Sequence, residues 1–478
     1  MVARRRGSYD VIIVGGGPAG IFAALELART TSLRVLLLEK GADLHRRKCP
    51  ARTTGICAHC SPCAITTGWG GAGAFSDGKL TLTAAVGGWL EEYVGTAATQ
   101  ALIAAVDAVY RSFGAPERLF GDESAVFERW SERAAREGMM LVRSPVRHLG
   151  TERAAAVLGA MRAELEDGVE IITGTTVTRI LTEKADGDGR LRATGVLTAD
   201  GEAFQSPVVI AAPGREGSSW LTEEAGRLGI PLVSNAVDVG VRVEVSATVM
   251  DAITEDLYEP KLLYTTRHFA DRVRTFCMNP HGVVCTESWG DAVTVNGHSY
   301  ASARRRTPNT NFALLVSTRF TEPFKEPIEF GKSIARLANM LGKDILVQRL
   351  GDLLAGRRST PQRMRENGVR PTLTAATPGD LAFALPYRHL HDVIEMLQAL
   401  DRLLPGVGGG ETLLYGAEVK FYSSRLALDS QLQTPLAGLY AVGDGAGVTR
   451  GLVQASASGL VAARAVAGGN AVSAAAPG

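Results

Sequence analysis

The sequence predicts an α/β protein in which a discontinuous Rossmann-like dinucleotide-binding domain carries an inserted α+β substrate domain built on an antiparallel sheet. Two observations carry this prediction. Short apolar strands run into glycine-rich turns near both ends of the chain. Between them the apolar pattern changes from helical spacing to long strands in which every second residue is apolar. The chain therefore leaves its dinucleotide-binding domain and returns to it.

The first glycine turn follows the apolar run 9–14 and precedes a predicted helix over 21–29. A strand, a glycine turn and a helix in this order form a pyrophosphate site, because the turn brings backbone N–H groups to the start of the helix. One glycine permits the turn, the next admits the pyrophosphate, and the last lets the helix pack on the strand. The predicted cofactor contacts here are Gly15, Gly17, Pro18, Ala19 and Gly20.

A second apolar strand over 34–38 ends in Glu39, followed by Lys40. An acid about 20 residues beyond the last glycine is where such folds accept the hydroxyls of an adenosine ribose. Glu39 and Lys40 are therefore assigned to the cofactor site.

Near the C-terminus a short strand runs into a Gly-Asp turn at Gly443 and Asp444, and an apolar helix is predicted over 452–466. An NAD site of simple Rossmann type has no use for this segment. FAD does, because its ribityl and pyrophosphate groups need a carboxylate and its O2 edge gains from a helix N-terminus. The predicted contacts are Gly443, Asp444, Gly451, Leu452 and Val453; a solvated turn is the alternative for Asp444.

At this point the chain resembles the glutathione-reductase-like FAD flavoproteins, in which an N-terminal glycine motif and a C-terminal Gly-Asp motif hold one FAD. The strand-to-glycine crossing at 208–214 fits the resemblance, although Pro213 departs from the usual Ala-Thr-Gly. Segments 68–80, 237–244, 274–280 and 418–423 are similar to a bacterial family labelled uncharacterised FAD-dependent dehydrogenases. The resemblance implies further FAD contacts at Gly71, Gly73, Lys79, Val177, Ala212 and Gly214.

The chain of 478 residues is comfortable for two domains, and its formal charge of +1 favours neither nucleic acid nor an anionic membrane. No run of 18 apolar residues and no signal peptide is found, so a cytoplasmic protein is expected. The predicted segments are 1–83, 168–236 and 405–466 for the FAD-binding domain, 84–167 for a mainly helical cap, 237–404 for the inserted substrate domain and 467–478 for a disordered tail.

Four cysteines, Cys49, Cys57, Cys60 and Cys63, lie in one short stretch with the spacing C-x7-C-x2-C-x2-C. Structural disulfides are not expected in a cytoplasmic protein, so the cluster indicates metal or redox chemistry. A [4Fe–4S] cluster, zinc with or without His59, redox thiols and inert cysteines all remain open. By contrast Cys277 and Cys285, on opposite arms of a predicted hairpin, are assigned to the core.

Candidate catalytic residues handle the charge and the proton that accompany hydride transfer. Lys79 and Lys420 are placed near the flavin N1–O2 edge, and Glu418, Tyr422 and His281 are proton-handling candidates. An ordinary structural role is the alternative for each. Arg242 and Glu244 are predicted either to pair on the polar face of their strand or to face solvent.

The glycines at 406–410 do not follow a strand, so no second dinucleotide-binding motif is found. Electrons are therefore expected to pass directly between flavin and a small organic substrate, by C–C or C–N dehydrogenation or by reduction of an activated double bond. O2, an electron-carrier protein or transiently docked NAD(P)H would close the cycle. The alternatives are a flavin monooxygenase using NAD(P)H and O2, and an electron-transfer module that serves a partner protein.

Overall fold

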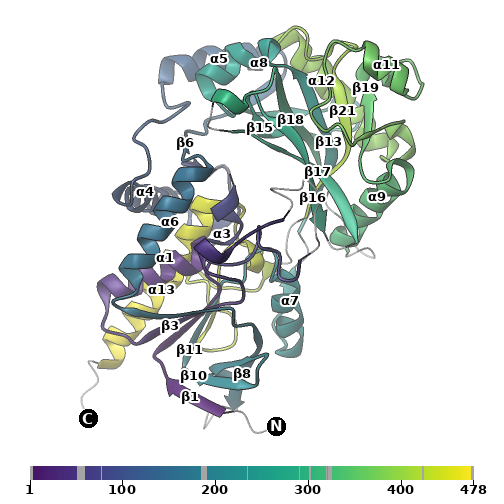
Figure 1. Cartoon of the computed structure of the whole chain (residues 1–478). Helices are drawn as coiled ribbons and strands as arrows, with labels where there is room; N and C mark the ends of the chain where they lie inside the picture. Colours follow the sequence, from purple (N-terminus) through teal and green to yellow (C-terminus); the bar gives the residue numbers. More distant parts are fainter. Residues whose placement is uncertain are drawn as a thin grey trace. The chain divides into compact units, whose positions relative to one another are not determined.

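The computed structural model describes residues 4–50, 60–76, 78–184, 191–233, 235–289, 291–300, 303–318, 320, 324, 326–421 and 425–474. The chain forms two compact units (Figure 1). The first comprises Met1–Arg118, Arg147–Ser234 and Ser423–Gly478, and the second comprises Leu119–Val146 and Asn235–Tyr422. A Rossmann-like unit and a second unit built on a largely antiparallel sheet confirm the predicted fold class.

The first unit is built on a five-stranded parallel sheet with the order β23-β11-β2-β3-β7. Three of its strands are fully buried along their length, which explains why the sequence reads as short continuous apolar runs. The bounds are β2 Val11–Val14, β3 Val35–Glu39, β7 Val169–Thr173, β11 Val208–Ala211 and β23 Leu439–Ala441.

A second sheet of this unit has the order β1-β10-β9-β8. Its strands are β1 Arg4–Ser8, β8 Val177–Lys184, β9 Leu191–Thr198 and β10 Glu202–Gln205. Two small pairs complete the strands, namely β4 Lys79–Thr81 with β6 Val146–His148, and β12 Leu232–Val233 with β22 Arg425–Leu426. The hairpin turn predicted at 186–189 lies outside the described residues.

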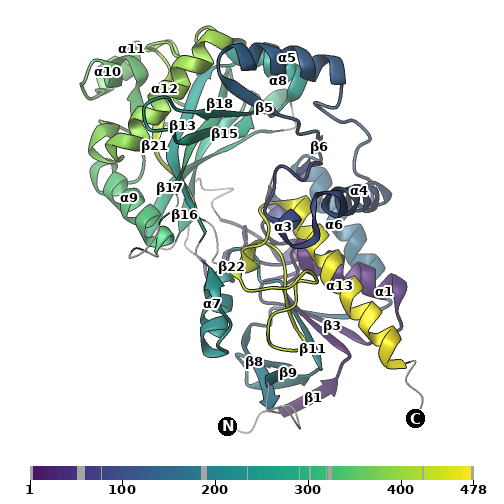
Figure 2. The same ribbon diagram turned by 180° about the vertical axis from the view of Figure 1, so that it is seen from behind.

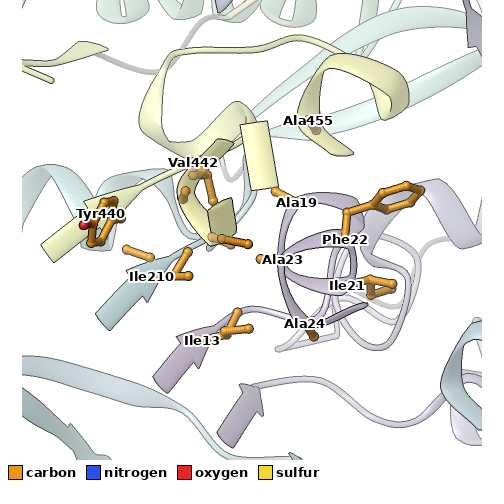
Figure 3. Close-up of a cluster of buried hydrophobic side chains, with 14 of the residues drawn as sticks. Ile13, Ala19, Ile21, Phe22, Ala23, Ala24, Ile210, Tyr440, Val442 and Ala455 are labelled. Carbon is orange, nitrogen blue, oxygen red and sulfur yellow. The ribbon is translucent and has the colours of Figure 1, made fainter. Parts of the chain in front are cut away.

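Helices α1 (Pro18–Thr30) and α13 (Leu452–Ala474) lie side by side in the first unit (Figures 1 and 2). Figure 3 shows the core beneath them, where Ile13, Ile210 and Val442 of the sheet face Ala23 of α1. The other helices are α3 Leu90–Val94, α4 Thr96–Ser112, α6 Thr151–Leu165 and α7 Ser218–Arg227, with short 3-10 turns at Leu44–Arg46, Gly71–Phe75 and Asp444–Ala446.

The second unit is built on an eight-stranded sheet with the order β20-β19-β21-β13-β18-β15-β14-β5. Every neighbouring pair except β19–β20 is antiparallel. The bounds are β5 Met139–Val142, β13 Val237–Ser246, β14 Lys261–Thr265, β15 Arg272–Asn279, β18 Asn309–Thr318, β19 Leu346–Arg349, β20 Thr377–Pro378 and β21 Leu413–Lys420.

Valines 237, 239, 241, 243 and 245 of β13 all face the core on which α8 and α12 pack, as their alternation predicts (Figure 2). The helices of this unit are α5 Ser124–Arg136, α8 Ala247–Leu257, α9 Pro327–Gly342, α10 Leu350–Leu354, α11 Pro361–Glu366 and α12 Tyr387–Leu403, with 3-10 turns at Ala303–Arg305 and Leu381–Phe383.

A separate hairpin of β16 (Val283–Trp289) and β17 (Ala292–His298) contacts the other face of β13, β18 and β21. The sequence predicts β15, β16 and β17 as one meander. In the structure β15 pairs with β14 and β18, whereas β16 pairs with β17. Cys277 and Cys285 therefore belong to different sheets, and both are half-buried rather than part of the core.

The boundaries of the two compact units differ from the predicted domain boundaries. Residues 119–146 of the predicted helical cap belong to the second unit, where β5 is an edge strand, and the second unit continues to Tyr422 because β21 completes its sheet. The predicted disordered tail begins at Ala467, whereas α13 continues to Ala474. Within the described residues no helix combines the length and the apolar character that crossing a membrane requires.

Gly459 of α13 tests the contact between the two long helices. A Cβ at Gly459 would stand 2.1 Å from the Ala19 carbonyl oxygen, whereas a Cβ at Gly468, farther along α13, meets no heavy atom within 4 Å. We expect Gly459→Ala to destabilise the protein by about 1–3 kcal/mol through overpacking. Gly468→Ala should be neutral or stabilising by up to about 1 kcal/mol. Equal urea midpoints for the two variants would contradict the close contact.

Candidate functional site

The glycines at the start of α1 do two different jobs. A Cβ at Gly15 (φ +115°) would stand 2.1 Å from the Ala212 carbonyl oxygen, and one at Gly20 would stand 1.9 Å from the Gly15 carbonyl oxygen. These two glycines are needed for the fold itself. A Cβ at Gly17 has no neighbour closer than the Gly71 Cα atom at 4.0 Å, so packing within the described protein does not explain this glycine. The space beside Gly17 fits a ligand.

No side chain caps the start of α1, where Gly17 is the N-cap and Pro18 the first helical residue. The N-terminal end of a helix carries partial positive charge and unpaired N–H groups, which together suit an anion such as a pyrophosphate.

The Glu39 carboxylate holds three backbone segments together. It is 6% exposed, and its Oε2 accepts a hydrogen bond from Gly16 N at 2.7 Å. Its Oε1 accepts hydrogen bonds from Gly41 N at 2.7 Å and from Gly68 N at 3.0 Å. An ionised carboxylate has about four acceptor positions, so about one is left for a ligand. The predicted ribose contact stays a prediction, and the structure adds a positioning role. The neighbouring Lys40 lies 3.8 Å from Glu216.

The loop containing Gly70, Gly71 and Gly73 lies between the starts of the two long helices. Gly70 N donates a hydrogen bond to Gly16 O at 2.7 Å. A Cβ at Gly71 would stand 3.2 Å from Gly17 Cα, and one at Gly73 would stand 2.6 Å from Leu452 Cδ2 of α13. The structure thus brings this predicted cofactor segment into contact with the glycine turn before α1 and with the start of α13.

Asp444 lies in the C-terminal turn, between Gly443 and the start of α13. Its carboxylate accepts hydrogen bonds from Thr449 Oγ1 at 2.8 Å and from Gly451 N at 3.2 Å, and Arg215 Nε lies 3.4 Å away. Burial raises the pKa of Asp444, while Arg215 and the two hydrogen bonds oppose that shift. A solvated turn aspartate would not be this enclosed, so the carboxylate is built into the turn.

The remaining predicted FAD contacts belong to the same unit. Ala212 N donates to Val14 O at 2.8 Å, and a Cβ at Gly445 would stand 2.4 Å from Gly214 O, so the crossing segment contacts both turns. Val177 starts β8, two residues after Thr175, whose N–H donates to Glu39 O. Val453 follows Leu452 in the first turn of α13.

Arg47 connects the cysteine segment to this site. Its buried guanidinium donates to Trp69 O at 2.6 Å, Ile65 O at 2.8 Å and Ala64 O at 3.0 Å. Burial lowers the pKa of Arg47 to about 10, against the opposing effect of Glu39 and Cys63. The backbone between Cys63 and the glycine loop is therefore fixed from within.

Cys49, Cys60 and Cys63 are free thiols, and Cys60 is exposed. Cys57 and His59 lie outside the described residues. Among the residues that are described, no three His, Cys, Asp or Glu side chains are grouped to hold a metal.

The predicted catalytic residues divide between the units. Lys79 is half-buried at the start of β4 in the first unit. Glu418 and Lys420 lie on β21 of the second unit with 3.2 Å between Glu418 Oε1 and Lys420 Nζ. His281 is engaged elsewhere, since its Nε2 lies 3.2 Å from Asp251 and its Nδ1 lies 3.1 Å from Thr307 O. Tyr422 lies outside the described residues.

Arg242 binds Glu418, a contact that the sequence analysis did not predict. It is fully buried and donates to both carboxylate oxygens of Glu418, at 2.7 Å from Nε and 2.6 Å from Nη2. Its Nη1 donates to Cys277 O at 2.8 Å, where a bulge in β15 gives Cys277 a φ of +48°. The expected Arg242–Glu244 pair and the solvent-facing alternative are both wrong.

Glu244 has its own buried partners. It accepts hydrogen bonds from the Tyr415 hydroxyl at 2.5 Å, the Thr372 hydroxyl at 2.5 Å and the Asn309 amide at 3.1 Å. Burial and the adjacent Glu244 carboxylate raise the pKa of Tyr415 well above its ordinary value. The charged residues that alternate with valines in β13 and recur in β21 could have indicated the two buried clusters around Glu418 and Glu244.

Comparison with known protein families supports the flavin assignment. Residues 9–62 match the family "Pyridine nucleotide-disulphide oxidoreductase", and residues 236–421 match "FAD-dependent protein, C-terminal domain-like". The chain is an FAD-dependent oxidoreductase, so the predicted enzyme class and the predicted FAD are confirmed at this level. A search of curated proteins finds no match.

Three enzymes are among the solved structures whose backbone path is similar to that of this chain. The 3-ketosteroid-Δ4-(5α)-dehydrogenase of Rhodococcus jostii is 14% identical, with a TM-score of 0.45 and 98% of each chain covered. The formate oxidase of Aspergillus oryzae is 13% identical, with a TM-score of 0.46, covering 98% of this chain and 100% of that one. The glycerol-3-phosphate dehydrogenase of Bacillus halodurans is 11% identical, with a TM-score of 0.39, covering 98% and 66%.

The open space at Gly17 gives a direct test of the cofactor site. Alanine fits its backbone (φ −83°) and meets nothing closer than 4.0 Å, so Gly17→Ala should fold normally. Because the methyl group takes the room of a pyrophosphate, we expect FAD affinity to fall about tenfold or more, a loss of about 1.4 kcal/mol. Gly226→Ala in α7, which also meets nothing within 4 Å, is the control. Unchanged FAD titration in Gly17→Ala would place the cofactor elsewhere.

Glu418→Gln tests the buried charge pair in the second unit. The change leaves the fully buried Arg242 guanidinium without its counter-charge, so we expect a loss of about 3–5 kcal/mol in the free energy of unfolding. Glu287→Gln is the control, because Glu287 is 28% exposed and binds the amine of Lys420 from the outer side. Urea unfolding that gives equal losses for both variants would show that the pair contributes no special stability.

Proposed function

We propose that the chain transfers a hydride or an electron pair between FAD and a small organic molecule, by C–C or C–N dehydrogenation or by reduction of an activated double bond. The observation that supports this most is the convergence of three glycine segments on the starts of α1 and α13 within the first unit. FAD, when bound, supplies the two-electron chemistry, and the chain supplies binding, orientation and charge.

In this proposal the backbone at Gly17 and the start of α1 receive the pyrophosphate. Asp444, held by Thr449 and Gly451, accepts hydrogen bonds from the polar chain of the cofactor. The start of α13 at Leu452 and Val453 would hold the flavin end of the cofactor, where the partial positive charge of a helix N-terminus would favour negative charge on the reduced flavin. These roles also agree with the proposed kinship to glutathione-reductase-like flavoproteins.

Lys420 is the best-supported charge-handling residue, with a different role from Glu418. Burial lowers the pKa of the Lys420 ammonium, but Glu418 and Glu287 raise it, and the net pKa lies above its ordinary value. Lys420 therefore stays protonated and acts as a hydrogen-bond donor or a positive charge, not as a base. Glu418 has both oxygens bound by Arg242, so its role is to hold Lys420 in place.

We further propose that Cys49, Cys57, Cys60 and Cys63 bind an iron–sulfur cluster or zinc, or act as redox thiols. Two features support this. The thiols have the spacing of a metal or cluster site, and Arg47 fixes the backbone between Cys63 and the glycine loop. The proposed electron partner is a carrier protein, NAD(P)H or O2, because the sequence has no second dinucleotide-binding motif.

Anaerobic bleaching of the FAD-loaded enzyme by small-molecule substrates tests the proposed reaction. An organic substrate should bleach the flavin, or reoxidise the reduced flavin, in one turnover. Lys420→Met should slow that step about 100-fold or more while retaining FAD, because general acid and electrostatic groups contribute on this scale. Lys332→Met in α9 is the control. If only NAD(P)H reduces the flavin and O2 is then consumed with substrate hydroxylation, the enzyme is a monooxygenase. Electron transfer to a carrier without any small-molecule turnover would favour the relay module.

A Cys57→Ser, Cys60→Ser, Cys63→Ser variant tests the cysteine proposal. We expect FAD to remain bound while iron and sulfide, or zinc, are lost from the purified protein. If the wild type holds no metal but contains a disulfide that responds to flavin reduction, the redox-thiol form of the proposal holds. Metal content that is the same in both proteins, or a wild type with neither metal nor reactive thiols, would refute the proposal.

A further inference from the structure

The segment 266–271, which connects β14 to β15, lies against one side of α12. Arg388 Nη2 donates to Asp271 at 2.8 Å, and Glu395 accepts hydrogen bonds from Arg267 N at 2.5 Å and His268 N at 3.4 Å. The His391 ring contacts the His268 ring at 4.6 Å between centroids. These helix residues recur with helical spacing, so one stripe of α12 holds the whole segment.

Asp392 lies in the middle of this junction and lacks what a buried carboxylate needs. It is 0% exposed, no donor among the described residues meets either carboxylate oxygen with full hydrogen-bond geometry, and the Thr266 hydroxyl is the side-chain donor beside it. Its neighbours across the junction are Thr266 and the Asp271 carboxyl group. Buried charges are normally paired, and two ionised carboxylates in contact repel one another. A single proton between the two groups supplies the missing donor.

The segment also forms one wall of a pocket of about 330 Å³ in the second unit. Arg267 and His268 line it from the segment, Glu395, Gln398 and Arg402 line it from α12, and Tyr264 lines it from β14. Any movement of the segment away from α12 therefore changes this pocket.

We propose that Asp271 and Asp392 share one proton and that its loss releases segment 266–271 from α12, so the pair acts as a proton-controlled latch on the pocket wall. This device is independent of the proposed reaction and of the cofactor site. Binding of the proton closes the junction, and deprotonation places two negative charges in contact within it.

The other charged and titratable groups around the pair agree with a junction that is closed when protonated and open when deprotonated. They are Arg388, His389, His391, His268, Glu395 and Arg267. Arg388 binds Asp271 and keeps that carboxyl ionised, with a lowered pKa, so the shared proton resides on Asp392. Burial, together with Asp271, raises the pKa of Asp392 to about 7. Burial lowers the pKa of His389 to about 4, so that ring is neutral and offers Asp392 no counter-charge.

The sign of the pH dependence follows from linkage. A carboxyl whose pKa is higher in the closed junction than in water favours the closed state at low pH and loses that preference as pH rises through about 7. With an ordinary pKa of about 3.9 once solvated, opening of the segment should become about tenfold more favourable between pH 6 and pH 8.5.

Hydrogen exchange of the amides in 266–271, followed by mass spectrometry on the FAD-loaded protein, tests the latch. After correction for intrinsic rates, the wild type should show about tenfold more opening at pH 8.5 than at pH 6. Asp392→Asn keeps a donor in place and should show no change with pH. The control, Asp344→Asn, alters an exposed aspartate after α9 and should behave as the wild type.

A second measurement detects the proton itself, and its result for the wild type stands whether or not the variant folds. Infrared difference spectra of the wild type between pH 6 and pH 8.5 should show the loss of one protonated carboxyl band, absent from Asp392→Asn. Equal exchange at both pH values in the wild type would overturn the latch. So would the absence of a protonated carboxyl at pH 6.

Discussion

In the first unit, α13 approaches α1 so closely that the two backbones touch at Gly459 and Ala19. The same kind of contact recurs between Gly20 and the Gly15 carbonyl, and between Gly71 and Gly17. At Gly459 and Gly20 a Cβ would collide with backbone that cannot move, and at Gly71 it would stand 3.2 Å from Gly17 Cα. The result is that the positive ends of two helices and one glycine loop meet at one place. The proposed cofactor site is therefore a consequence of how the unit packs.

In the second unit the largest sheet is covered on both faces, and the two faces are buried by different kinds of residue. One face carries the valines of β13 and the helices that pack on them, and the other carries Arg242, Glu418 and Glu244 under the β16–β17 hairpin. Buried ions add little net stability compared with apolar residues, yet leaving one of them unpaired is costly. Such a layer is specific rather than strongly stabilising, since the sheet has to assemble in the register that satisfies every charge.

The sequence was sufficient where local pattern decides the structure. The glycine turn after β2 and the alternation in β13 follow from periodicity and from the needs of a tight turn, and both lie where they were predicted. The helix predicted over 21–29 is present but begins three residues earlier, at Pro18. The C-terminal turn at Asp444 was predicted for the same reason.

What could not be predicted depends on residues far apart in the chain. Arg242 and Glu418 are 176 positions apart, and their pairing follows from the order β21-β13-β18, which no local pattern specifies. The three N–H groups on Glu39 also come from separate segments. Asp392 reads as an ordinary polar position of an amphipathic helix until the segment that buries it is known.

The most direct test of this account is to release the flavin from the purified, reconstituted protein with acid, identify it by chromatography and count it per chain. A site made by two helix starts, a carboxylate at the end of β3 and a Gly-Asp turn predicts one FAD per chain. FMN alone, or no flavin after incubation with FAD, would contradict the claim that the three glycine segments form a single dinucleotide site.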